Sequence, residues 1–156
     1  MYKLVVVPAT GAACDAAVFA AAIMVARFAG AHLQFLHVKP DSADMLIAMT
    51  SGGLGGGAGI QEMIDRVDRD ADATERQVWE AFGAFCQAEG ITTASAPGIG
   101  VPVPSAELAV ETGAEAQWLA EYGRFADLIV LGRGRDTATP ALDTLEAALL
   151  DTGRPL

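Results

Sequence analysis

The chain has 156 residues, of which 52% are hydrophobic and only 6% aromatic, so it has the length of one domain and enough apolar material for a sizeable core. Ten Lys and Arg against twenty Asp and Glu give a formal charge of -10, which repels phosphate backbones and anionic headgroups and argues against nucleic acid and membrane surfaces as partners. Cys14 and Cys86 are the only cysteines, which favours a reducing compartment. We therefore expect a cytoplasmic protein with a single domain over residues 1–156.

The first forty residues have the pattern of a strand, a helix and a second strand. Residues 4–7 are an aliphatic run that stops at Pro8 and predicts a central strand buried on both faces. Apolar residues then recur at helical spacing over residues 12–28, and Gly30 stands where a C-terminal cap belongs. Residues 33–38 predict the next strand. Together these segments make a βαβ unit.

Residues 41–59 are the least regular part of the sequence. Residues 50–59 are rich in glycine and predict a flexible loop beside a hydrophobic patch. A glycine-rich loop also suggests phosphate binding, but no Gly-Lys-Ser or Gly-Lys-Thr follows it and no strand directly precedes it. We interpret the loop as a flexible flap.

A long helix is predicted next, because apolar residues from Ile60 to Phe85 recur every three or four positions. Its other face is charged. There the Asp68, Asp70 and Asp72 spacing imitates a calcium loop, but the required glycine and the terminal glutamate are absent. These aspartates are therefore interpreted as a solvated helix face.

The last third of the chain predicts two strands and two helices. Either residues 91–96 or residues 106–111 could form the third strand, and the alternation of the latter favours it. A helix follows Gly113, residues 128–131 predict a fourth buried strand, and residues 140–152 predict a C-terminal helix. The expected fold is a three-layer α/β/α sandwich around a small, mainly parallel sheet, similar to nucleotide-binding folds.

No catalytic constellation is visible in the sequence. His32 and His37 are the only histidines, and a structural or pocket-lining role for His37 is favoured over that of a general base. A Gly-x-Ser-x-Gly elbow, a His-Glu-x-x-His helix and a cysteine cluster are all missing. The sequence therefore favours a protein that is not an enzyme.

Three segments together carry a resemblance to a known family: KLVVVPATGA, LHVKP and YGRFADLIVLGRGR. They resemble the universal stress protein pattern nearly from end to end. The resemblance implies the nucleotide-binding-like fold named above, related to the adenine nucleotide alpha hydrolases, and a protein that acts in stress response. Many members dimerise. The ending TLEAALLDTGRPL and the glycine-containing insert look like members in which two such domains lie in tandem.

The resemblance also implies a fifth strand after the final helix, but the sequence stops where that strand would begin. We therefore expect four strands and an open sheet edge. A second copy, a loop, or the other half of a tandem chain should cover this edge. A homodimer is favoured.

ATP-binding members of the family have the sequence Pro-Val-Asp-Gly-Ser after the first strand. Here the positions read Pro8, Ala9, Thr10, Gly11, Ala12, so the aspartate is replaced by threonine. After the fourth strand the family has Gly-x-x-Gly, nine residues, Gly-Ser. The residues that match this pattern, or that follow the buried strands, complete the candidate pocket: His37, Val38, Gly132, Arg133, Gly134, Arg135, Asp143 and Thr144.

The second motif is also degenerate. Gly134 fits only if one residue is deleted, and Asp143 puts a carboxylate where the family has a glycine close to phosphate. A carboxylate near a helix N-terminus fills the role that an anion would take. Arg133 and Arg135 argue for a ligand, since they follow a buried strand. The expectation is a degenerate pocket with no cofactor; an ATP-binding switch with weak ATPase activity is the alternative.

Overall fold

The computed structural model describes residues 2–51, 58–95, 100–132 and 142–156. These described ranges contain eleven elements. They are β1 (Leu4–Pro8), α1 (Asp15–Ala29), β2 (His32–Lys39), α2 (Ser42–Ser51), α3 (Ala58–Glu89), β3 (Thr92–Thr93), β4 (Ser105–Thr112), α4 (Glu115–Phe125), β5 (Leu128–Ile129), α5 (Leu142–Glu146) and the π-helical turn η1 (Ala147–Asp151).

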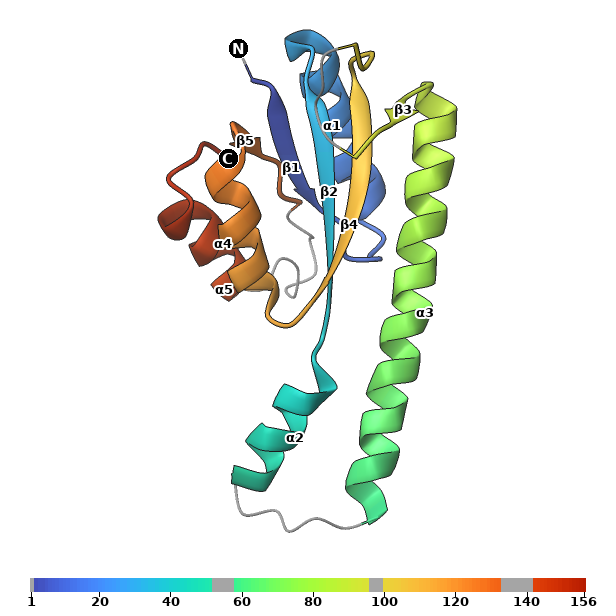
Figure 1. Ribbon diagram of the computed structural model, residues 1–156, viewed down its shortest axis with the longest axis vertical. Coiled ribbons are helices and arrows are strands. Elements are labelled where there is room, and N and C mark those ends of the chain that lie inside the picture. The colour runs from blue at the N-terminus through green and yellow to red at the C-terminus, as the bar shows by residue number, and fades with distance from the viewer. Residues whose placement is uncertain (1, 52–57, 96–99, 133–141) are drawn as a thin grey trace.

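The strands form one parallel sheet in the order β3-β4-β2-β1-β5. β1 and β2 lie at its centre, where Val5, Val6 and Val7 are fully buried, as their aliphatic run predicts. The predicted α/β architecture with a small parallel sheet is confirmed (Figure 1).

Two hydrophobic cores lie on opposite faces of the sheet. α1 and α3 pack on one face through residues such as Phe19, Val78 and Phe82, and the ring of Phe35 contacts those of Phe19 and Phe82 edge-on. α4 and η1 pack on the other face. The connections between neighbouring parallel strands run over the faces of the sheet. Helices therefore cover both faces, and the fold has three layers.

The prediction of four strands is wrong. The sheet has five, because both candidate segments for the third strand are strands: Thr92 and Thr93 pair with Ser105 and Ala106 at the sheet edge. The strand expected after the final helix is absent from the described residues, and the end of the chain instead lies beside β5. There the Ile129 N–H donates to the Pro155 carbonyl oxygen over 3.0 Å, so the end of the chain contacts the edge that was expected to be open.

Two further segments differ from their predictions. Residues 42–51 form α2, although the sequence suggested irregular structure there. The two ends of the loop predicted at residues 50–59 belong to α2 and α3, and residues 52–57 of that prediction lie outside the described ranges. The buried strand predicted at residues 128–131 is shortened to β5, in which Ile129 is fully buried and Leu128 is half-buried, because β5 lies at the edge of the sheet.

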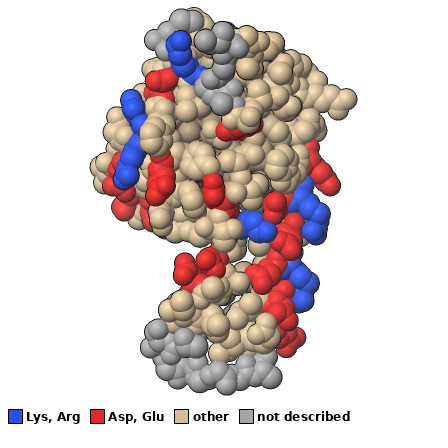
Figure 2. Space-filling view, in the orientation of Figure 1, with Lys and Arg blue, Asp and Glu red and all other residues tan. Residues whose placement is uncertain are grey.

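α2 and the first half of α3 extend past the carboxyl ends of β2 and β4 (Figure 1). α3 has 32 residues, which corresponds to about 48 Å at the helical rise. Charged side chains of both signs gather along α3 in this lower part of the molecule (Figure 2). Within the described residues, no helix is both long enough and apolar enough to cross a membrane.

Candidate functional site

The loop after β1 is closed by a carboxylate from the first turn of α1. Asp15 Oδ2 accepts hydrogen bonds from the backbone N–H of Thr10 at 2.9 Å and of Gly11 at 2.8 Å, and Asp15 Oδ1 accepts one from the Thr10 hydroxyl at 2.9 Å. The Ala12 N–H in turn donates to the Thr10 hydroxyl oxygen. Three successive backbone donors are therefore occupied within the protein, at the place where an anion would otherwise bind.

Gly11 is required by the shape of this loop. Its φ of 78° favours glycine, and an added Cβ would lie 2.7 Å from the Thr74 side chain of α3. The loop is thus pressed against α3. Pro8 and Ala9 precede it, and the Ala9 N–H donates to the Leu36 carbonyl oxygen at 2.8 Å, which extends the pairing of β1 with β2.

His37 supports the same loop from β2. Its side chain is buried, and Nδ1 lies 2.8 Å from the Ala9 carbonyl oxygen. The favoured structural role is therefore consistent with its contact, whereas its Nε2 finds no hydrogen-bond partner in the part of the chain that is described. Val38 is half-buried and packs against the core on the opposite face, so it does not line the same space as His37.

Gly132 lies directly against α1. A Cβ built on it would approach Val18 Cγ2 to 2.2 Å, so only glycine lets the chain pass this helix. The crevice between the β1 loop and the end of β5 has a volume of about 10 Å³, enough for one water molecule. Its lining residues are Pro8, Thr10, Cys14, Asp15, Val18, Glu115, Leu131 and Gly132.

Two carboxylates, Asp15 and Glu115, line this crevice, and a third, Asp143, acts electrostatically on Glu115. Burial raises the pKa of the Glu115 carboxyl, and the negative charges of Asp143 and Asp15 raise it further. Glu115 begins α4, Asp15 begins α1, and Asp143 lies in the first turn of α5. The first turns of three helices therefore present negative charge to one region.

Of the residues compared with the family's second glycine motif, the structure describes Gly132, Asp143 and Thr144. The Asp143 side chain is exposed, and its Oδ1 accepts a hydrogen bond from the Thr144 N–H at 2.9 Å. Thr144 itself is buried, at 1% exposure, so its hydroxyl does not face an open pocket. Arg133, Gly134 and Arg135 lie outside the described residues.

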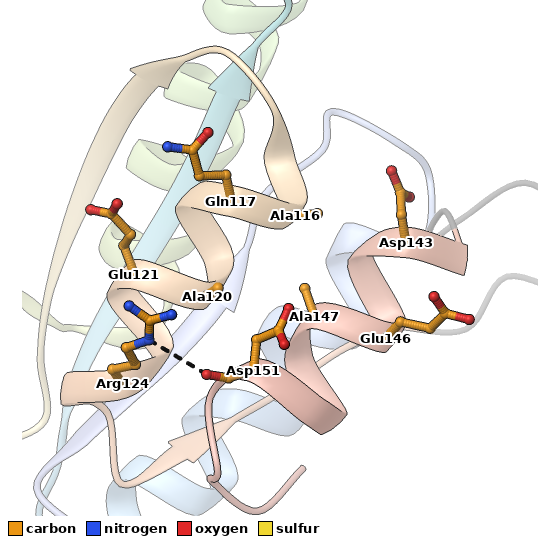
Figure 3. A pocket seen from close by; sticks show the side chains of 9 residues that line it. All are labelled: Ala116, Gln117, Ala120, Glu121, Arg124, Asp143, Glu146, Ala147 and Asp151. Atoms are coloured by element: carbon orange, nitrogen blue, oxygen red, sulfur yellow. Dashed lines mark hydrogen bonds between the residues drawn. The ribbon is translucent and has the colours of Figure 1, made fainter.

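A larger cleft, of about 450 Å³, lies between α4 and the α5–η1 segment. Ala116, Ala120 and Ala147 lie between the helices, while Glu121 and Glu146 point toward opposite rims (Figure 3). The Arg124 Nε donates across the cleft to the Asp151 carbonyl oxygen at 3.5 Å. Because Glu121 and Glu146 diverge and Arg124 is bonded to the backbone of Asp151, the cleft does not gather its charged groups around a single ligand position.

The chemistry available at the site is limited. Among the described residues, no three His, Cys, Asp or Glu side chains stand close enough to hold a metal ion. Cys14 lines the crevice and Cys86 is buried, where desolvation raises the pKa of its thiol to about 11. A neutral thiol is a poor nucleophile.

Comparison with solved structures identifies the fold. The universal stress protein UspA from Lactobacillus plantarum superposes with a TM-score of 0.66 at 18% identity, over 99% of this chain and 94% of that one. The fold is that of a universal stress protein. A second solved structure, the hypothetical protein MJ0577, has a TM-score of 0.52 at 11% identity over 99% of this chain and 93% of its own. Neither the known family models nor the curated proteins contain a match.

The universal stress protein fold confirms the resemblance carried by the first two strands and the β5 region. Two acidic residues that line the crevice were not among the residues predicted from the sequence. Asp15 and Glu115 match no motif, because the family pattern directs attention to position 10 and to the loop after β5. The signal that could have found them is an acidic residue in the first turn of a helix that follows a strand.

Proposed function

We propose that this chain is a universal stress protein that acts in stress response as a regulatory protein without enzymatic activity, and that its nucleotide pocket is degenerate and does not bind ATP. The observation that carries the proposal is the Asp15 carboxylate bound to the N–H groups of Thr10 and Gly11. Because both N–H groups already donate to the Asp15 carboxylate, a phosphate group could bind them only by displacing that side chain.

Electrostatics supports the same conclusion. Asp15, Glu115 and Asp143 all act on one region, and the raised pKa of the Glu115 carboxyl reflects burial and the two negative charges beside it. A triphosphate brought to this region would add several negative charges to the three carboxylates. The formal charge of -10 increases the repulsion at longer range.

Space is a third argument. Ligand pockets typically enclose a few hundred Å³, whereas the crevice beside Gly132 offers about 10 Å³. Opening it requires Val18 or the loop after β1 to move; Val18 is packed in the hydrophobic core, and the loop is held by the hydrogen bond between the Thr10 hydroxyl and Asp15. We infer a cytoplasmic homodimer, or one domain of a tandem chain, whose regulatory effect depends on protein partners rather than on bound ATP.

A thermal-shift titration with ATP and magnesium tests the proposal. Ligand at 100 times its Kd stabilises a protein by about 2.7 kcal/mol, which would be seen as a clear rise in Tm. We expect no rise up to millimolar ATP. A saturable rise, accompanied by release of phosphate over hours, would instead favour the nucleotide-switch alternative with weak ATPase activity.

A further inference from the structure

α2 and residues 58–70 of α3, which we name the arm, lie beyond the main body of the protein. Figure 1 shows the arm extending past the carboxyl ends of β2 and β4. The contacts of α3 with the core come from its later turns, where Val78, Phe82 and Cys86 are buried. The arm is therefore not needed to complete the hydrophobic core on that face.

The apolar stripe of α3 nevertheless continues along the arm. Ile60, Ile64 and Val67 keep the helical spacing of the stripe, but they are only half-buried, and Met63 beside them is 47% exposed. α2 packs against this part of α3. A pair of helices buries an apolar stripe fully only when another layer packs on it.

The charges at the edge of this stripe suit a second copy of the same helix. Arg66 and Asp70 lie one turn apart on the Met63 side of α3, and both are exposed. The ion pairs of the described residues involve only Arg27, Lys39 and their acidic partners. If two α3 helices cross antiparallel near position 68, Arg66 of each chain lies opposite Asp70 of the partner subunit.

We propose that the arm is a self-association surface on which a second copy packs antiparallel, burying Met63 and forming two symmetric Arg66–Asp70 pairs. A two-fold contact of this kind presents the same patch from both chains, so complementarity within one patch is sufficient. The proposal deepens the homodimer part of the proposed function and is independent of the ATP pocket.

Sedimentation equilibrium on charge-reversal variants tests the pairing. Arg66→Glu places two like-charged contacts in the interface, and so does Asp70→Arg; each variant alone should self-associate roughly tenfold more weakly than the wild type. An equimolar mixture of the two variants should recover association. In the mixed dimer, the new carboxylate at position 66 of one chain faces the new guanidinium at position 70 of the other. Pairing within one chain cannot produce this recovery.

Met63→Asp tests the apolar part and should weaken association by at least roughly tenfold. Arg76→Glu, an exposed change on α3 outside the arm, is the matched control and should have no effect. Phe28 of α1 is 92% exposed and offers a competing apolar surface. A dimer broken by Phe28→Ser but not by Met63→Asp would overturn the arm proposal alone. A strict monomer at all concentrations would overturn the homodimer as well, and a mixture that fails to associate would overturn the charge pairing.

Discussion

Asp15 holds Thr10 with both carboxylate oxygens, one bonded to the backbone N–H and one to the hydroxyl, each over 2.9 Å. Removing the carboxylate leaves these donors, and that of Gly11, without protein partners in a partly buried loop. We expect Asp15→Ala to lower the free energy of unfolding by about 2 kcal/mol. Urea denaturation measures this change. Asp44→Ala, at an exposed first-turn position of α2, is the control and should change it by less than about 0.5 kcal/mol.

The close approach of Gly132 to Val18 gives a second prediction. Gly132→Ala forces a methyl group into a contact of 2.2 Å and should destabilise the protein by about 1–3 kcal/mol. In the double variant with Val18→Ala, the combined loss should be smaller than the sum of the two single losses. Gly83→Ala on α3 meets nothing within 4 Å and should stabilise by about 0.5–1 kcal/mol. Additive losses at Gly132 and Val18 would refute the contact.

Glu115 should make stability depend on pH. Its pKa is raised above the ordinary value of 4.5 by burial, then by Asp143 and Asp15. A raised carboxyl pKa favours the protonated form in the folded state, so the cost of ionisation is absent below the ordinary pKa, develops as pH rises and is complete above the folded pKa. Glu115→Gln should therefore raise Tm by a few degrees at about pH 7.5 and hardly at all at about pH 4. An equal effect at both pH values would contradict this assignment.

Asp127 should show the opposite dependence. Its Oδ2 accepts hydrogen bonds from the N–H groups of Lys3 at 2.7 Å and Leu4 at 3.0 Å, which lower the pKa of the carboxyl, with a smaller contribution from Arg154. The resulting stability is present above the unfolded pKa and is lost as pH falls through the folded one. Asp127→Asn should cost about 1 kcal/mol at neutral pH. The loss, measured by urea denaturation, should shrink in acid, whereas Asp68→Asn on exposed α3 should have little effect.

Strong local signals explain which elements the sequence could predict. The aliphatic run predicted β1, and Gly30 predicted the end of α1, because hydrophobic patterning and helix capping are local properties of the sequence. Gly30 has a φ of 65°, and its N–H donates to the Ala26 carbonyl oxygen. β3 has only two residues, both exposed threonines, so its pairing with β4 leaves no apolar pattern. α2 was not predicted because its apolar residues directly precede a glycine-rich stretch, and glycine-rich sequence is typical of loops.

The site was less predictable than the fold, because its main features depend on tertiary contacts. Thr10 and Asp143 could be compared with family positions one by one. The folding back of Asp15 onto the preceding loop, and the influence of Asp15 and Asp143 on Glu115, appear only once α1, α4 and α5 converge on one end of the sheet. Gly132 was predicted as a ligand position, whereas its contact with Val18 gives it a packing role.

Calorimetric titration of the intact protein with magnesium ATP tests the central claim most directly, because it measures binding at the closed loop and carboxylate cluster without relying on a change in stability. The account predicts no saturable heat for the wild type at millimolar ATP. It predicts that Thr10→Asp combined with Asp143→Gly, which brings both positions closer to the family pattern, yields at most weak binding, while Asp44→Ala remains without signal. Saturable micromolar binding of ATP to the wild type would contradict the account.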